Sequence, residues 1–287
     1  MSGSDKKVHP FWDKDPVLKE EEVFSGLGFT RGSLLFLGRY TLKEVMAVLA
    51  KKSFFREAKK RNLWPIKYRF DSSEYPVQRL LIYWLEEHPD KVIVDLKIRE
   101  GNVKFLAPEK HGYPLPSQHC LLFEWLTLQN PRLSFDDKHP PLPGQTRPGL
   151  SLSKKILEVF LYLSKLIQID GLVAFPAYFH NALLFSRYFY FVNPIREGEL
   201  KAIRKQFSHL PFRQLAWAVY LGCLTKASGE VYEWNAEEQV FPLSDQLKEY
   251  LDSKLYKEIV RHVEKTARFN VDWELLRVKT RQQGILY

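Results

Sequence analysis

One acidic residue interrupts an otherwise apolar run in the middle of the sequence. Glu124 lies within residues 119–128, a mainly apolar segment typical of a central strand. Burial there would disfavour the charged form of its carboxylate, as suits a general base working near neutral pH. Alternatively, Glu124 sits at an open strand end or pairs with a basic neighbour. His180 is a second candidate base, although a histidine beside a helix start is commonly a cap or a core residue.

A second stretch has the composition of an anion-binding turn. Residues 145–151 include Arg147, Gly149 and Ser151, and they directly precede the most strongly amphipathic helix pattern in the chain, at 151–168. The first N–H groups of a helix lack partners and the helix dipole is positive there, so phosphate binds favourably. Gly149 would allow the backbone to approach such a ligand closely. The same residues also suit an ordinary junction between a loop and a serine-capped helix.

Hydrophobic periodicity predicts the elements that would position these residues. We expect three further helices and several strands before residue 193, and a Pro-rich surface loop or lid at 131–148. The predicted elements are a strand at 33–40, a basic helix at 41–62, a helix at 77–88, a hairpin formed by 91–100 and 103–107, a strand at 119–128, the helix at 151–168, a strand at 171–177, a helix at 180–189 and a short strand at 190–192.

Beyond residue 193 the pattern becomes mainly helical. Helices are expected at 197–207, 212–225 and 244–269, with a hairpin formed by 229–234 and 238–243. The sequence therefore predicts an α/β fold with three parts: an N-terminal arm at 1–32, a domain at 33–193 and a helical region at 194–287.

The order of elements in the central domain resembles the GNAT N-acetyltransferase superfamily. Its phosphate-binding motif is matched in part by Gly149 and Ser151, and its Asn-x-x-Ala-x-x-x-Tyr-x-x-x-Gly-Phe signature is similar to residues 181–191. In that register Ser186 takes the place of the tyrosine that protonates the departing thiolate, and Tyr188 follows two residues later. Asn181 is displaced by two positions from the family's asparagine.

The resemblance implies a mixed central sheet flanked by helices and a cleft for acetyl-CoA or another acyl-CoA. It implies that Glu124, Ser186 and Tyr188 are the candidate catalytic residues. The candidate cofactor-binding residues are Arg147, Gly149, Leu150, Ser151, Leu152, Ser153 and Asn181. The implied activity is transfer of an acyl group to a small-molecule or peptide amine by direct attack in a ternary complex. The alternatives are a non-catalytic GNAT-like binding protein and a nucleic-acid-binding or interaction module.

Composition and charge limit the kinds of ligand and the function classes that we expect. The net charge is +9, and residues 41–70 carry nine basic side chains against two acidic ones, which can attract phosphate or can simply form a solvated helix face. Cys120 and Cys223 are expected to be buried free thiols. No metal-ligand spacing, nucleotide-binding loop, apolar membrane span or secretory signal occurs, so we expect a cytoplasmic protein with no membrane partner and no metal.

Overall fold

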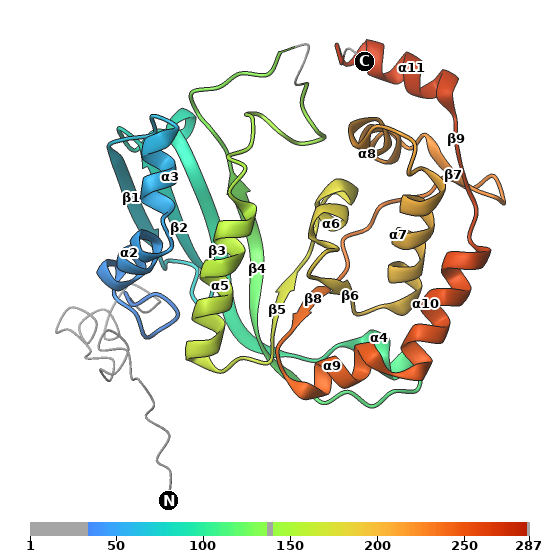
Figure 1. Ribbon diagram of the computed structural model, residues 1–287, viewed down its shortest axis with the longest axis horizontal. Helices are drawn as coiled ribbons and strands as arrows, with labels where there is room; N and C mark the ends of the chain where they lie inside the picture. The colour runs from blue at the N-terminus through green and yellow to red at the C-terminus, as the bar shows by residue number, and fades with distance from the viewer. Residues whose placement is uncertain (1–33, 137–139, 286–287) are drawn as a thin grey trace, which may run out of the picture. The chain divides into compact units, whose positions relative to one another are not determined.

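The computed structural model describes residues 34–136 and 140–285 (Figure 1). The predicted N-terminal arm at 1–32 lies outside the described residues. The described chain is a mixed α/β structure that forms two compact units, each assembled from separate segments. The first unit comprises 34–100, 124–132 and 149–168, and the second comprises 101–123, 133–136, 140–148 and 169–285.

The helices and strands follow one another along the chain with short connections in most places. The helices are α2 (Leu42–Lys51), α3 (Phe54–Lys60), the 3-10 turn η1 (Pro89–Lys91), α4 (Leu106–Lys110), α5 (Ser153–Ile167), α6 (Phe179–Phe185), α7 (Pro194–Gln206), α8 (Phe212–Tyr220), α9 (Asp245–Asp252), α10 (Lys254–Thr266) and α11 (Trp273–Gln282). The strands are β1 (Ile66–Asp71), β2 (Gln78–Trp84), β3 (Val92–Val103), β4 (Gln118–Leu128), β5 (Gly171–Ala174), β6 (Tyr190–Phe191), β7 (Leu224–Lys226), β8 (Gln239–Pro242) and β9 (Phe269–Val271).

The main sheet has seven strands in the order β1-β2-β3-β4-β5-β8-β6. Antiparallel pairs join β1 to β2, β2 to β3, β5 to β8 and β8 to β6. In contrast, β4 and β5 are parallel, from Cys120 opposite Gly171 to Phe123 opposite Ala174. The strand β5 ends there, whereas β4 continues to Leu128. A parallel pair needs a long crossover, and here the crossover contains α5.

The core of the first unit lies between the sheet and the helices α2 and α5. Apolar side chains of both helices and of β2, β3 and β4 surround one small residual space of about 30 Å³, among them Leu49, Val94 and Phe160. Burying such side chains stabilises the fold by about 1.5–3 kcal/mol each. Thr41 and Glu44 form the predicted capping box at the start of α2. The predicted amphipathic helix at 151–168 is therefore confirmed as α5, with its apolar stripe on the sheet.

Other predictions for this unit are wrong in type. Within the helix predicted at 77–88, residues 78–84 form the strand β2 instead, because the run from Leu80 to Tyr83 is buried on both faces of the sheet. Periodicity alone does not separate such a continuous apolar run from a buried helix. The predicted basic helix at 41–62 is divided into α2 and α3 at Ser53, whose φ of 66° is left-handed. Within the strand predicted at 33–40, the described residues 34–40 form a tight turn closed by a bridge between Phe36 and Tyr40.

The hairpin predicted around Gly101-Asn102 is absent from the described chain, since β3 continues through both residues to Val103. The second predicted hairpin, formed by 229–234 and 238–243, is also wrong. Its second arm becomes β8, which pairs with β5 and β6, while Val231 bridges to Thr225. Both predictions relied on local turn residues, and tertiary pairing overrides that signal.

The second unit contains the predicted helices after residue 193, with changed ends. The long helix at 244–269 is two helices, α9 and α10, because Ser253 caps the start of α10 through a hydrogen bond from Tyr256 N. Helices α7 and α10 lie side by side (Figure 1). Gly198 allows this close approach, since a Cβ atom there would lie 2.6 Å from Val263 Cβ and 2.9 Å from Val260 O.

Buried tyrosine hydroxyls of α9 and α10 bind the end of the short strand β6 and the residue after it. Tyr250 donates a hydrogen bond to Val192 O and Tyr256 donates one to Phe191 O, each at 2.7 Å. Both cysteines of the chain are buried free thiols, as expected from the sequence. Burial raises the pKa of the Cys120 thiol to about 12, so it stays protonated and unreactive at neutral pH.

Candidate ligand-binding pocket

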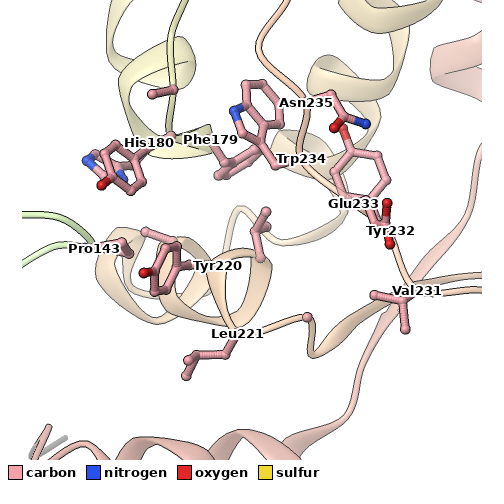
Figure 2. A pocket seen from close by; sticks show the side chains of 15 residues that line it. Pro143, Phe179, His180, Tyr220, Leu221, Val231, Tyr232, Glu233, Trp234 and Asn235 are labelled. Carbon is pink, nitrogen blue, oxygen red and sulfur yellow. The ribbon is translucent and has the colours of Figure 1, made fainter.

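A pocket of about 540 Å³ lies entirely within the second unit (Figure 2). Residues of α6 and α8, the turn after α8, the segment before β8 and one proline of the 131–148 loop surround it. The lining residues are Pro143, Ala177, Tyr178, Phe179, His180, Ala216, Val219, Tyr220, Leu221, Gly222, Val231, Tyr232, Glu233, Trp234 and Asn235. A space of this size is within the range of small-molecule sites.

Aromatic rings form much of the pocket wall, and they hold one another in place. Tyr178 stacks on His180 with ring centroids 5.4 Å apart, and Phe179 meets Trp234 edge to face at the same distance. The indole N–H of Trp234 donates a hydrogen bond to Pro176 O at 3.0 Å, which fixes the ring plane. In Figure 2, Tyr220 from α8 faces Phe179 and His180 from α6 across the space. The walls are preorganised by these contacts.

The long loop predicted at 131–148 contributes a buttress to this wall. Gly144 has a φ of +75°, and any Cβ atom there would overlap the Tyr178 ring, so only glycine fits. Just before Gly144, Pro143 lines the pocket and Pro141 O accepts a hydrogen bond from the Trp217 indole at 3.0 Å. The described part of the loop is thus docked against the wall.

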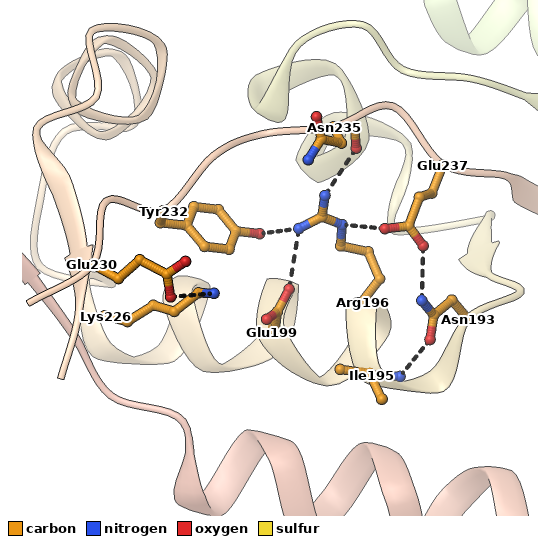
Figure 3. A network of polar contacts seen from close by, with 9 residues as sticks. All are labelled: Asn193, Ile195, Arg196, Glu199, Lys226, Glu230, Tyr232, Asn235 and Glu237. Atoms are coloured by element: carbon orange, nitrogen blue, oxygen red, sulfur yellow. Dashed lines mark hydrogen bonds and ion pairs between the residues drawn. The ribbon is translucent and has the colours of Figure 1, made fainter. Parts of the chain in front are cut away.

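A buried guanidinium organises the segment that carries Tyr232, Trp234 and Asn235 (Figure 3). Arg196 of α7 is only 6% exposed. Its Nη1 donates to the Tyr232 hydroxyl at 2.9 Å, and its Nη2 donates to Asn235 O at 3.0 Å. Since these two residues lie on the pocket wall, Arg196 ties that wall to α7.

Two carboxylates balance this guanidinium. Glu199 accepts a hydrogen bond from Arg196 Nη1 at 3.1 Å. Glu237 Oε1 lies 3.0 Å from Arg196 Nε in an ion pair whose N–H direction falls outside hydrogen-bond geometry. Burial lowers the pKa of Arg196, but Tyr232 and the two carboxylates raise it by more than burial lowers it. The net pKa is therefore raised, and the side chain stays charged. Burial also raises the pKa of the Tyr232 hydroxyl, which therefore stays protonated.

His180 is 3% exposed and faces the pocket wall rather than capping a helix. Burial lowers its pKa to about 4 from the usual 6.5. The imidazole is therefore neutral at pH 7. The sequence prediction of a packed core histidine describes its environment better than that of a general base poised near neutral pH.

The first unit holds Glu124, which is exposed rather than desolvated as expected. Its Oε1 accepts a hydrogen bond from Arg99 Nε on the neighbouring strand at 2.6 Å. The structure thus realises the alternative of a strand glutamate paired with a basic neighbour. Gly149 pairs with Gln129, five residues further along this strand, which separates Gly149 from Glu124 by roughly 16 Å.

The predicted anion-binding segment leads into α5, as expected, but its backbone is partly committed. Leu150 N donates to Leu128 O at 3.3 Å, and Leu150 O accepts a hydrogen bond from Arg61 Nε at 3.1 Å. Gly149 is outside the left-handed region, and a Cβ atom there would meet nothing closer than Leu128 O at 3.7 Å. Ser151 is left-handed with a φ of 56°. Leu152 occupies the N-cap position of α5 without a side-chain cap, and Ser153 begins the helix.

The second unit holds Arg147, Asn181, Ser186 and Tyr188, and none of these four lines the pocket. Arg147 Nη1 lies 3.5 Å from Ser134 Oγ. Asn181 is in the first turn of α6, and Ser186 ends that helix by donating its hydroxyl to Leu183 O at 2.8 Å. Tyr188 is exposed in the following turn.

Sequence reasoning found only part of the pocket. Of the aromatic residues at 178–191, Tyr178 and Phe179 line it, while Phe189 and Phe191 belong to the core and Tyr190 is exposed. The residues that were missed are Arg196, which holds the wall from α7, and the lining residues Tyr220, Tyr232, Glu233 and Trp234, which come from segments far from α6 in sequence. Their only local signal is a concentration of aromatic residues at 232–234.

Basic side chains gather on the first unit, as the sequence predicted for 41–62. On α2, α3 and β1 the exposed cations are Lys43, Lys51, Arg56, Lys59, Lys60, Lys67 and Arg69. Trp64 and Tyr68 are exposed among them, and Lys59 Nζ lies 4.2 Å from the Trp64 ring centroid. We call these seven cations together with Trp64 and Tyr68 the basic surface. Arg61 and Lys60 pair with Glu57 and lower its pKa to about 2, so part of the charge is neutralised locally.

Neither a membrane-spanning helix nor a metal cluster occurs among the described residues. No helix in 34–136 or 140–285 is both long and apolar enough to cross a membrane. In the same ranges no three His, Cys, Asp or Glu side chains gather as a metal site. Compared with models of known protein families the sequence matches none, and among curated proteins it has no significant match.

Proposed function

We propose that this protein transfers an acyl group from acetyl-CoA or another acyl-CoA to an amine, on a GNAT-like fold. The observation that carries the proposal is the mixed sheet, in which β4 and β5 form a short parallel pair joined through α5. The resemblance described from the sequence implies a mixed central sheet flanked by helices, and α5 is the strong helix that lies between β4 and β5 in the chain. The antiparallel pairing of β8 between β5 and β6 adds support.

The start of α5 is the proposed position of the cofactor's pyrophosphate. This helix has no side-chain cap, and its dipole favours an anion at that end. Because the Leu150 amide is already bonded to Leu128 O, the cradle begins at Ser151 rather than Gly149. The role assigned to Gly149 changes accordingly: it borders the phosphates and need not contact them.

Acyl transfer needs an amine without its extra proton and a proton for the leaving thiolate. The amine nitrogen attacks the thioester carbonyl, the C–S bond breaks, and the thiolate takes up a proton. Ser186 already donates its hydroxyl to Leu183 O, so it is a poor proton donor for this step. Tyr188, whose side chain is exposed, is the better candidate. Glu124 would act as base only if its pairing with Arg99 were exchanged for the amine.

Calorimetric titration with CoA and acetyl-CoA tests the cofactor site. Wild type should bind both, and Gly149→Asp should lose most of the affinity, because a carboxylate beside the phosphates repels them. The fold should survive, since the substituted side chain meets nothing closer than 3.7 Å and the backbone is not left-handed. Asn102→Asp, on β3, is a matched control for the added charge. Absence of CoA binding to wild type would overturn the proposal, and binding without transfer to any amine would favour a non-catalytic sensor.

Nucleic-acid binding is the second candidate function, favoured by the basic surface. Exposed aromatic rings next to cations allow stacking on bases as well as phosphate contacts. A single-stranded oligonucleotide should bind with an affinity that falls steeply as salt rises. Arg56→Glu with Lys67→Glu should abolish this binding, whereas the same reversal at Lys248 and Lys254 in the second unit should not. Equal loss in both variants would indicate only a net-charge effect.

A further inference from the structure

We propose that the aromatic pocket of the second unit binds an aromatic amine as its ammonium ion. This binding rests on the pocket alone and is independent of the proposed acyl transfer. The observations that carry it are the charge of the pocket lining, the arrangement of its rings and the fixed wall around them.

The charges on the pocket favour a cation. Its lining contains the carboxylate of Glu233 and no lysine or arginine. Behind the wall, Arg196 faces two carboxylates, Glu199 and Glu237, so this network also carries excess negative charge. His180 is neutral at pH 7 and does not repel a cation. An anionic ligand such as the phosphate end of CoA would find no positive partner on this lining.

The rings determine the shape of the ligand. Tyr220 is 53% exposed, and its ring packs against Tyr178 with centroids 5.9 Å apart, so the exposed part of Tyr220 is open to a ligand in the pocket (Figure 2). One face of Trp234 is already used, since Arg196 lies 5.0 Å from its ring centroid. A flat apolar body therefore fits beside Tyr220. Aromatic faces also attract an ammonium group, and desolvation strengthens the attraction.

The carboxylate determines where the ammonium lies. Glu233 is on the side of the pocket formed by Tyr232 and Val231, across from the α6 rings (Figure 2). An ammonium group at this side of the pocket would have that carboxylate as a partner. Asn235 is a further polar residue of the lining. An ammonium ion that carries an aromatic ring thus matches the pocket in charge and in composition.

Titration with 2-phenylethylamine tests this proposal, with 2-phenylethanol as the neutral isostere. Binding is followed by isothermal calorimetry and by chemical-shift changes of the indole N–H groups. The amine should bind roughly tenfold more tightly than the alcohol at pH 7. Glu233→Gln should remove roughly three- to tenfold of the amine affinity and leave the alcohol unchanged. Tyr220→Ala should weaken both ligands.

The matched control is Glu230→Gln, which removes the same charge three residues earlier on an exposed side chain outside the pocket. It should bind the amine like wild type. Equal affinity for amine and alcohol, or equal loss in Glu230→Gln and Glu233→Gln, overturns the ammonium site. Binding of the amine by a protein that does not bind CoA supports the pocket and refutes the proposed acyl transfer. Binding of CoA without the amine has the opposite meaning.

Discussion

Replacing Arg196 by methionine should destabilise the second unit strongly. The guanidinium is 6% exposed and makes three hydrogen bonds of 2.9–3.1 Å as well as an ion pair at 3.0 Å. Removing one member of a buried charge pair typically costs about 3–5 kcal/mol. Glu199 and Glu237 keep side-chain exposures of 20% and 31%, so water can solvate them in part. We therefore expect a loss of about 2–4 kcal/mol in the free energy of unfolding.

Urea unfolding followed by far-ultraviolet circular dichroism measures this loss. Arg196→Lys keeps the charge but not the fork that reaches Tyr232 and Asn235 together, so its loss should be intermediate. Arg277→Met removes an exposed ion pair of the same unit and should cost at most about 0.5 kcal/mol. Adding Glu237→Gln to Arg196→Met should restore part of the stability, because it removes one of the uncompensated charges.

A loss of less than about 1 kcal/mol in the free energy of unfolding of Arg196→Met, which is the range of a surface ion pair, would contradict this prediction. A second readout separates the positioning role from stability alone. Because Arg196 fixes Tyr232 and Asn235 on the pocket wall, Arg196→Met should also weaken binding of 2-phenylethylamine at temperatures where the protein is still folded. Unchanged affinity would mean that the wall keeps its form without the guanidinium.

Three further changes test other parts of the second unit. His180 has a pKa of about 4 in the folded protein against 6.5 in the unfolded chain, so the unfolded chain binds the extra proton first as the pH falls. The stability that this group contributes is complete above pH 6.5 and is lost as the pH falls toward 4. Between pH 7.5 and 4.5, wild type should therefore lose about 2–3 kcal/mol more than His180→Phe in parallel denaturation curves. Gly198→Ala should destabilise the protein by about 1–3 kcal/mol despite the better helix propensity of alanine, because the new methyl group would meet Val260 O at 2.9 Å. Unchanged thermal stability would contradict this and would show that α10 can move away. Gly144→Ala should weaken 2-phenylethylamine binding, since its methyl group would displace the Tyr178 ring, and equal binding in calorimetry would contradict the buttress role.

The helix α5 could be predicted from sequence because its burial is one-sided, which leaves an apolar stripe in the pattern. The strand β4 was also predicted correctly, although Cys120, Leu121 and Leu122 are buried on both faces, because a mainly apolar run was interpreted there as a central strand. The strand β2 was missed because its residues are buried on both faces, which removes the alternation that distinguishes a strand. The paired position of β8 depends on strands more than 40 residues away, and no local turn signal carries that information.

The site was less predictable than the fold, for a related reason. Tyr178 and His180 could be singled out because they lie together before and within α6. Arg196 could not, since three of its partners lie 36 to 41 residues later and an arginine near a helix start is normally expected to be solvent-exposed. Glu124 was judged from its apolar neighbours in the chain, whereas its environment depends on Arg99 of the adjacent strand.

The interleaved composition of the two units bears on how the chain folds during synthesis. The first unit receives α5 only from residues 149–168, after the chain has already supplied 101–123 and 133–148 to the other unit. On the ribosome, α2 alone covers part of the apolar sheet face, and the rest stays exposed until residue 168 has emerged. At 5–20 residues per second this interval lasts several seconds, about the time during which an exposed strand surface can recruit chaperones or aggregate. Fragments that stop before α5 should accumulate as insoluble protein.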